Sequence, residues 1–169
     1  MSEIGKTYRK ALTGKRNREA GEAWENMIEA ACRNYRLYGL AEIEKVPEPM
    51  RPISRPNAKG QFLACFSKQA QPDYQGTLKG GQSVVFEAKH TSTDRMERKV
   101  ISEEQEKKLN RHQKLGAMCF VLVSFSLKKF YRIPWEVFRD MKDHYGRKYI
   151  KPEDIEEYEV KFFGYLRFL

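Results

Sequence analysis

The segment around a glycine pair constrains the fold more than any other part of the chain. Residues 73–78 and 83–89 carry β-branched and aromatic residues, and they flank residues 79–82, Lys-Gly-Gly-Gln. Glycine adopts the positive φ angles that tight hairpin turns require, so a glycine pair between two strand-like runs is a strong hairpin signal. The segment therefore predicts two antiparallel strands joined by a short turn.

The second of these strands carries two charged side chains on one face. Side chains alternate between the faces of a strand, so Glu87 and Lys89 point to the same side as Val85. The turn returns Asp73 alongside them, with the register open by one residue. We therefore expect two carboxylates and one ammonium group to meet at a single place.

Helices and strands on either side of the hairpin complete an alternating pattern. Apolar residues recur at helical spacing over residues 24–35, and a capping box, Ser102 with Gln105, starts a second helix. Further strands are expected over residues 40–46, 118–125 and 130–133, and a third helix over residues 135–145. The pattern predicts an α/β fold, a single domain with a central mixed β-sheet flanked by helices.

Between two expected strands lies a proline-rich excursion, residues 47–71. Pro47, Pro49, Pro52 and Pro56 fall within ten residues, which excludes a regular helix or a central strand. We predict a semi-rigid basic stalk that protrudes from the domain. An ordinary surface loop is the alternative, although loops of this length in compact domains are usually functional or disordered.

The chain has a surplus of positive charge. Its 32 Lys and Arg residues against 23 Asp and Glu give a formal net charge of +9. Such a surplus suits a polyanionic partner, because each phosphate neutralised releases counterions; a solubilising surface is the alternative. Residues 1–16 carry several cations without apolar periodicity, so we expect a flexible basic arm there, outside a domain of residues 17–169.

Membrane proteins and disulfide scaffolds are excluded as classes. The longest apolar run, residues 117–123, is too short to cross a bilayer, and residues 1–10 lack the apolar core of a signal peptide. Cys32, Cys65 and Cys119 are far apart and lack the close pairs of a zinc site. We expect a cytoplasmic protein with reduced cysteines.

The grouping of Asp73, Glu87 and Lys89 suits hydrolysis of a phosphodiester. Carboxylate oxygens bind Mg²⁺ while leaving positions for water and a phosphate oxygen, and the metal lowers the pKa of its water. A neighbouring ammonium group can position that water or stabilise the developing charge. The alternative is a surface ion pair beside an unrelated turn aspartate. The pattern is short and common, so spacing alone leaves both open.

Several short motifs occur in a defined order. They are residues 45–47 (Lys-Val-Pro), 66–76 (Phe-Ser-Lys-Gln-Ala-Gln-Pro-Asp-Tyr-Gln-Gly) and 85–89 (Val-Phe-Glu-Ala-Lys), then Gln105 ahead of the strand at residues 120–125. Together they resemble the RecU-type Holliday junction resolvases of the PD-(D/E)xK nuclease superfamily. The resemblance implies a restriction-endonuclease-like fold, a homodimer, and paired nicks in four-way DNA junctions. It also implies that Mg²⁺ is required, with Mn²⁺ as a substitute, and that the products carry 5′-phosphates.

The resemblance further implies roles for individual residues. Asp73 and Glu87 match the metal ligands, and Lys89 matches the catalytic lysine. Gln105 matches a helix glutamine that orients the lysine or the water, and Glu25 matches the glutamate of the first helix. From the residues alone, capping explains Gln105 and solvation explains Glu25. The residues expected to bind DNA are Arg51, Arg55, Lys59 and Lys68 in the stalk, with Arg16 and Arg18 near the first helix.

The chain departs from the family pattern in two places. Ala20 stands where an arginine is usual, and His90 and Thr91 follow the lysine where an acidic residue is common. The short basic arm fits a phage or mobile-element member. We expect resolution of Holliday junctions in recombination and repair. Two alternatives stay open, a restriction-like or repair nuclease that cuts duplex DNA and a non-catalytic junction-binding recombination factor.

Overall fold

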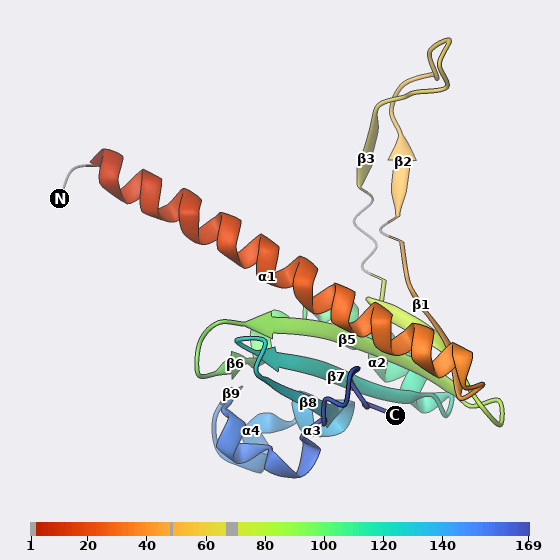
Figure 1. The fold of residues 1–169 in the computed structure, drawn as a ribbon, viewed down its shortest axis with the longest axis vertical. Coiled ribbons are helices and arrows are strands. Elements are labelled where there is room, and N and C mark those ends of the chain that lie inside the picture. Colours follow the sequence, from red (N-terminus) through yellow and green to blue (C-terminus); the bar gives the residue numbers. More distant parts are fainter. Residues whose placement is uncertain (1–2, 48, 67–70) are drawn as a thin grey trace.

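The computed structural model describes residues 3–47, 49–66 and 71–169. A five-stranded β-sheet forms its centre, with helix α1 on one face and helices α2, α3 and α4 on the other (Figure 1). In chain order the elements are α1 (Glu3–Leu37), β1 (Ala41–Lys45), β2 (Met50–Pro52), β3 (Ala64–Phe66), β4 (Tyr74–Leu78), β5 (Ser83–Thr91), β6 (Met96–Glu97), η1 (Arg98–Val100), α2 (Glu103–Lys114), β7 (Met118–Phe125), β8 (Lys129–Pro134), α3 (Trp135–Arg139), α4 (Met141–Tyr145), β9 (Tyr149–Ile150), η2 (Pro152–Asp154) and η3 (Glu156–Tyr158).

The strands of the central sheet follow the order β1-β4-β5-β7-β8. All neighbours are antiparallel except β5 and β7, which run parallel. A parallel pair needs a crossover connection, and α2 supplies it. The predicted mixed sheet flanked by helices is therefore confirmed.

The sheet separates two hydrophobic cores. On the α1 face, Trp24 and Ile28 of the helix pack with Phe86 of β5. On the other face, Leu109 of α2 and Trp135 of α3 pack with strand residues. Because both faces are covered, the central strands are apolar on both sides, and a charged side chain on them is unusual.

The predicted hairpin is confirmed at the centre of the sheet. Strands β4 and β5 pair across residues 79–82, and Gly80 and Gly81 have φ angles of 96° and 92°. Gly76 in β4 is needed for a different reason. A Cβ there would lie 2.0 Å from the Glu42 backbone oxygen of β1, so only glycine lets these strands approach.

The proline-rich segment forms a two-stranded ribbon that projects away from the sheet (Figure 1). Strands β2 and β3 pair only with each other, in an antiparallel register. Beyond them, the Ile53 N–H donates to the Leu63 carbonyl, and Asn57 caps the turn through its side chain. The ribbon thus satisfies its backbone internally. The predicted protrusion is observed, although residues 48 and 67–70 lie outside the described residues.

Two expectations about helices are corrected. Helix α1 begins at Glu3, so residues 3–16 are helical where an irregular basic arm was expected. Lys, Arg, Ala and Glu favour helix without needing an apolar face, so this part gave no periodic signal. The helix expected over residues 135–145 is broken at Asp140, whose backbone leaves the helical region and whose carboxylate pairs with Arg139.

The C-terminal aromatic segment packs only partly on the sheet. Leu166 and Phe168 are buried, whereas Phe162 and Phe163 are exposed. The Tyr35 hydroxyl ties this segment to α1, since it donates to the Leu166 carbonyl and accepts from the Phe168 N–H. No helix in the described residues has the length and apolar character needed to span a membrane.

Candidate active site

Strands β4 and β5 bring the three predicted groups together. Their register pairs Tyr74 with Phe86, which places Asp73, one residue before β4, opposite Glu87. The Asp73 carboxylate accepts a hydrogen bond of 2.9 Å from the Ala88 N–H. The register that the sequence left open by one residue is thereby settled.

Lys89 links the two carboxylates. Its Nζ lies 3.1 Å from Asp73 Oδ2 and 2.9 Å from Glu87 Oε2. Two carboxylates and an ammonium group therefore meet at one place, as the hairpin predicted. Their catalytic roles stay predictions.

Glu87 is fully buried, with 0% of its surface exposed. Burial raises the pKa of its carboxyl above the ordinary value; the Lys89 ammonium opposes this rise and the Asp73 carboxylate adds to it. Burying a carboxylate is costly unless its oxygens are satisfied. Within the described residues, Glu87 Oε1 has no hydrogen-bond partner. A bound cation would supply the partner that Glu87 Oε1 lacks.

Lys89 keeps its charge because of its neighbours. Burial by itself would lower the pKa of the ammonium group, but the Asp73 and Glu87 carboxylates raise it above the ordinary value. The charged form of Lys89 is thus favoured beside the two carboxylates.

Gln105 connects helix α2 to the site. Its backbone N–H donates to the Ser102 hydroxyl and its side-chain oxygen accepts from the Ser102 N–H, which completes the predicted capping box. Its Nε2 donates to Glu87 Oε2. One side chain therefore caps the helix and holds the buried carboxylate, two roles that spacing could not separate.

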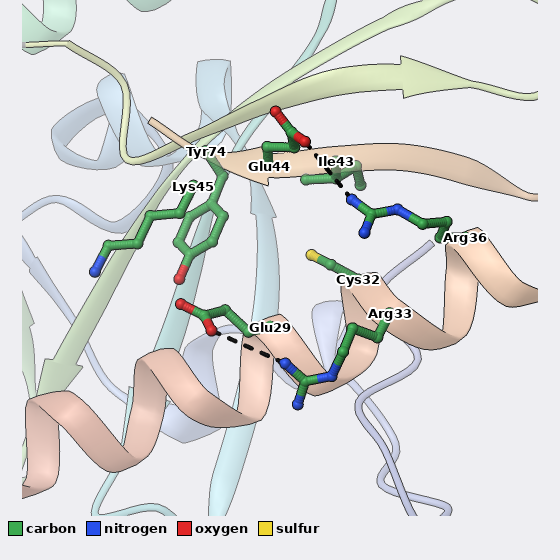
Figure 2. A pocket seen from close by; sticks show the side chains of 8 residues that line it. All are labelled: Glu29, Cys32, Arg33, Arg36, Ile43, Glu44, Lys45 and Tyr74. Carbon is green, nitrogen blue, oxygen red and sulfur yellow. Dashed lines mark ion pairs between the residues drawn. The ribbon is translucent and has the colours of Figure 1, made fainter. Parts of the chain in front are cut away.

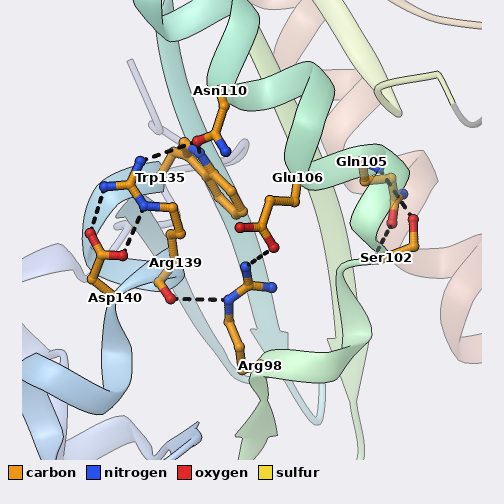
Figure 3. A network of polar contacts seen from close by, with 8 residues as sticks. All are labelled: Arg98, Ser102, Gln105, Glu106, Asn110, Trp135, Arg139 and Asp140. Carbon is orange, nitrogen blue, oxygen red and sulfur yellow. Dashed lines mark hydrogen bonds and ion pairs between the residues drawn. The ribbon is translucent and has the colours of Figure 1, made fainter.

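A polar network fixes α2 against the rest of this face (Figure 3). Arg98 donates to the Glu106 carboxylate at 2.5 Å and to the Arg139 carbonyl at 3.1 Å. One turn further, Asn110 accepts from the Trp135 indole at 2.8 Å and from Arg139 at 3.1 Å. These contacts join residues up to 41 positions apart, so no sequence pattern signalled them.

We predict that Gln105→Ala lowers DNA cleavage by roughly 10- to 100-fold, as is usual when a group that orients a metal ligand is lost. Binding should stay near the parent level, because Gln105 contacts Glu87 and no predicted DNA-binding group. Cleavage rates and binding in EDTA measure the two effects. Ser102→Ala is the matched control, since it removes the cap, about 1 kcal/mol of stability, but keeps the Gln105 amide. If both variants lost the same factor in cleavage rate, capping of α2 would account for the whole effect of Gln105.

Glu25 is not brought to this cluster. Helix α1 packs on the face of the sheet opposite Glu87, and the Glu25 carboxylate forms an ion pair of 2.6 Å with Lys45 of β1. In the described residues Lys45 is the hydrogen-bond partner of Glu25, and the role that the resemblance gives Glu25 stays a prediction. Sequence spacing gave the helix but not the face of the sheet on which it packs.

A cleft lies on the α1 face, beside Lys45 and the buried ring of Tyr74 (Figure 2). Its cations already have carboxylate partners: Arg33 lies 4.0 Å from Glu29, and Arg36 lies 3.8 Å from Glu44. The cleft therefore offers little free positive charge to a phosphate, and it is separate from the Glu87 site.

The predicted DNA-binding cations are exposed where the structure describes them. Arg16 and Arg18 lie in the N-terminal half of α1, and Arg55 and Lys59 lie between β2 and β3. Arg51 of β2 donates to the Cys65 sulfur at 3.2 Å. Lys68 lies outside the described residues. All of these DNA contacts stay predictions.

The side chains that could hold a metal ion are Asp73 and Glu87. In residues 3–47, 49–66 and 71–169 there is no group of three or more His, Cys, Asp or Glu arranged for a metal ion. Mg²⁺, however, usually binds through one or two carboxylates, with waters and substrate phosphates completing its shell. Two carboxylates at one place, with Glu87 Oε1 unsatisfied, fit that requirement.

Comparison with known proteins matches the chain to a family. The model of Recombination protein U (RecU) matches residues 19–168. The Holliday junction resolvase RecU of Streptococcus gordonii is 32% identical over 120 residues, which cover 68% of this chain and 60% of that protein. The protein of the same name from a Geobacillus species is 28% identical over 170 residues, which cover 91% of this chain and 84% of that protein. The chain thus spans less than two thirds of the Streptococcus gordonii relative.

A solved structure shares the fold. The Holliday junction resolvase Hjc of Archaeoglobus fulgidus superposes with a TM-score of 0.51 and 10% sequence identity, over 79% of this chain and 92% of that one. The predicted restriction-endonuclease-like architecture, a single α/β domain with a mixed central sheet, is confirmed by this likeness.

Proposed function

The chain belongs to the Recombination protein U (RecU) family, and on this basis we propose that it resolves four-way DNA junctions as a metal-dependent endonuclease. The observation that carries the proposal is the meeting of Asp73, Glu87 and Lys89 on one face of the central sheet. A carboxylate pair with a lysine suits phosphodiester cleavage, and the ribbon suits a branched substrate. The relatives' name, Holliday junction resolvase, supports the same substrate.

In the proposed mechanism, Asp73 and Glu87 hold Mg²⁺, for which Mn²⁺ can substitute. The cation, when bound, supplies an acidified water and neutralises charge on the phosphate. Lys89 would orient the attacking water, or stabilise the charge that develops on the phosphate as the oxygen of the water attacks phosphorus. The bond from phosphorus to O3′ then breaks, which leaves a 5′-phosphate. Gln105 keeps Glu87 in place throughout.

Two opposed strands must be cut to resolve a junction, and the described residues of one chain form one such site. We therefore propose that the protein works as a homodimer whose two sites act on one junction. The proposal extends to the compartment: the protein acts on DNA in the cytoplasm, whether the gene is cellular or carried by a phage or mobile element.

The experiment that tests this function maps and ligates the products. Each strand of a synthetic four-way junction is labelled in turn and cleaved by the purified protein in Mg²⁺. Nicks at symmetric positions in two opposed strands, sealable by DNA ligase, are expected. A restriction-like nuclease would cut a linear duplex of the same sequence equally well, and a non-catalytic binding factor would shift the junction in a gel without cutting it.

We predict a steep salt dependence of junction binding. If exposed cations contact phosphates, the logarithm of the affinity should fall with the logarithm of salt concentration by about 0.9 per phosphate neutralised on duplex arms. Titrations in EDTA from low to physiological salt give the slope without cleavage. A flat response would mean that the +9 net charge serves solubility alone.

A further inference from the structure

Helix α2 carries a run of cations for which the proposed mechanism has no use. Lys107, Lys108, Arg111 and Lys114 occupy its central and last turns. In the part of the chain that the structure describes, none of the four has a carboxylate within 4.0 Å. The first turn of the helix carries Glu103, Glu104 and Glu106, and Glu106 is paired with Arg98. Two cations on neighbouring elements are paired, since Arg139 and Arg147 lie beside Asp140 and Asp154.

Three of these cations form a stripe on the solvent face of the helix. Lys107, Arg111 and Lys114 are exposed and follow the spacing of neighbours on one helical face. Leu109, by contrast, is fully buried against the sheet. At 1.5 Å of rise per residue the stripe is about 10 Å long, or roughly three base-pair steps along a DNA strand.

The stripe is tied rigidly to the active site. Gln105, in the first turn of the same helix, contacts Glu87. The side of α2 that faces α3 is occupied by contacts from Glu106, Asn110 and Gln113. The backbone of α2 is therefore held in place beside Glu87, and the stripe lies on the solvent-facing side of that helix. In the chain, Asp73 lies between the end of β3 and the start of β4.

We propose that Lys107, Arg111 and Lys114 form a phosphate-binding track for the duplex arm that is cut, with Lys108 at its edge. This proposal rests on the proposed function. Phosphate contacts position DNA without reading its sequence, and an arm has the same backbone in a junction and in a linear duplex. The track therefore supplies affinity and alignment for both, whereas discrimination belongs to the ribbon.

The test is the triple variant Lys107→Gln, Arg111→Gln, Lys114→Gln. The salt slope of junction binding should fall by about 2.7, and linear duplex should weaken by the same factor, so that the preference for junction stays unchanged. Cleavage at subsaturating protein should fall in step with binding and stay dependent on Mg²⁺, because Gln105 and Glu87 are intact. Glutamine has nearly the helix propensity of lysine and arginine, so the fold is preserved.

Two matched variants separate the track from general charge and from helix stability. The first control removes three exposed cations elsewhere, by Lys79→Gln, Lys142→Gln and Lys148→Gln. The net charge therefore falls from +9 to +6 in this control, as it does in the track variant. Lys107→Arg, Arg111→Lys, Lys114→Arg keeps the track's charge and should bind like the parent. Cations in the last turn also interact favourably with the helix dipole. If that were their whole role, replacing them would lower the melting temperature and leave the salt slope of binding unchanged.

The outcomes distinguish the track from the function. The track is contradicted if the salt slope falls equally in the two glutamine triples. It is also contradicted if the first triple loses only dimer mass or melting temperature. Neither result bears on junction cleavage by the parent protein. A parent protein that neither binds nor cuts a junction overturns the proposed function, and the track with it.

Discussion

Replacing Asp73 with Asn, or Glu87 with Gln, is expected to abolish junction nicking while junction binding in EDTA stays close to the parent. Both changes keep the shape of the side chain and remove the charge that would hold a cation. In the structure Glu87 is fully buried with one unsatisfied oxygen, so its replacement should leave the surface that DNA meets unchanged. Loss of a preorganised group that stabilises the transition state costs about 100- to 1,000-fold, and loss of a ligand should reach at least the upper end.

Lys89→Ala should likewise lose turnover while the protein still folds. Its head group lies between the two carboxylates, within 3.1 Å of each, so its loss removes the charge that would orient water. Cleavage rates, binding in EDTA and circular dichroism measure the three effects. Asp143→Asn, which neutralises an exposed carboxylate on α4, is the control and should cleave like the parent. Substantial Mg²⁺-dependent cleavage by the purified Asp73→Asn or Glu87→Gln variant would contradict the assignment of the active site.

Replacing residues 49–62 with a short Gly/Ser linker should remove most of the preference for junction over duplex. The active site meets one phosphodiester in either substrate, so selection must come from groups that reach the branch point. The ribbon projects from the sheet and carries Arg51, Arg55 and Lys59 on its exposed surface. Repeated proline also limits its conformational freedom, so it can project without collapsing onto the domain.

We expect junction affinity to drop by at least about tenfold in this variant, or roughly 1.4 kcal/mol, with weak duplex binding nearly unchanged. Strands β2 and β3 pair only with each other, so the central sheet should survive, and circular dichroism and dimer mass check this. The matched variant Arg51→Gln, Arg55→Gln, Lys59→Gln keeps the ribbon and removes its charge, which separates shape from electrostatics. If the shortened protein prefers junction as strongly as the parent, the discriminator lies elsewhere, in the cleft between protomers.

The hairpin and its charged face could be predicted from sequence because both depend on local rules. Glycine fixes the turn, alternation fixes the face, and together they bring Asp73, Glu87 and Lys89 together. The capping box of α2 is equally local. These features are also the ones that carry the resemblance to the RecU family.

Other features depend on tertiary packing and left no local signal. The face on which α1 packs decides where Glu25 lies, and an amphipathic pattern does not specify it. The contact of Arg98 with Glu106 depends on where η1 meets α2. The first half of α1 is highly charged, and its residues 12–19 are exposed, so its helical structure produced no hydrophobic period. In each case the missing information was which surfaces meet.

The most direct test of the central claim compares four reactions of the purified parent protein. A four-way junction and a linear duplex of the same sequence are each incubated with Mg²⁺ and with EDTA, and nicked strands are resolved on a denaturing gel. The account predicts paired nicks in the junction with Mg²⁺, little cutting of the duplex, and none in EDTA. Equal cutting of both substrates, or no cutting of a junction that the protein binds, would contradict it.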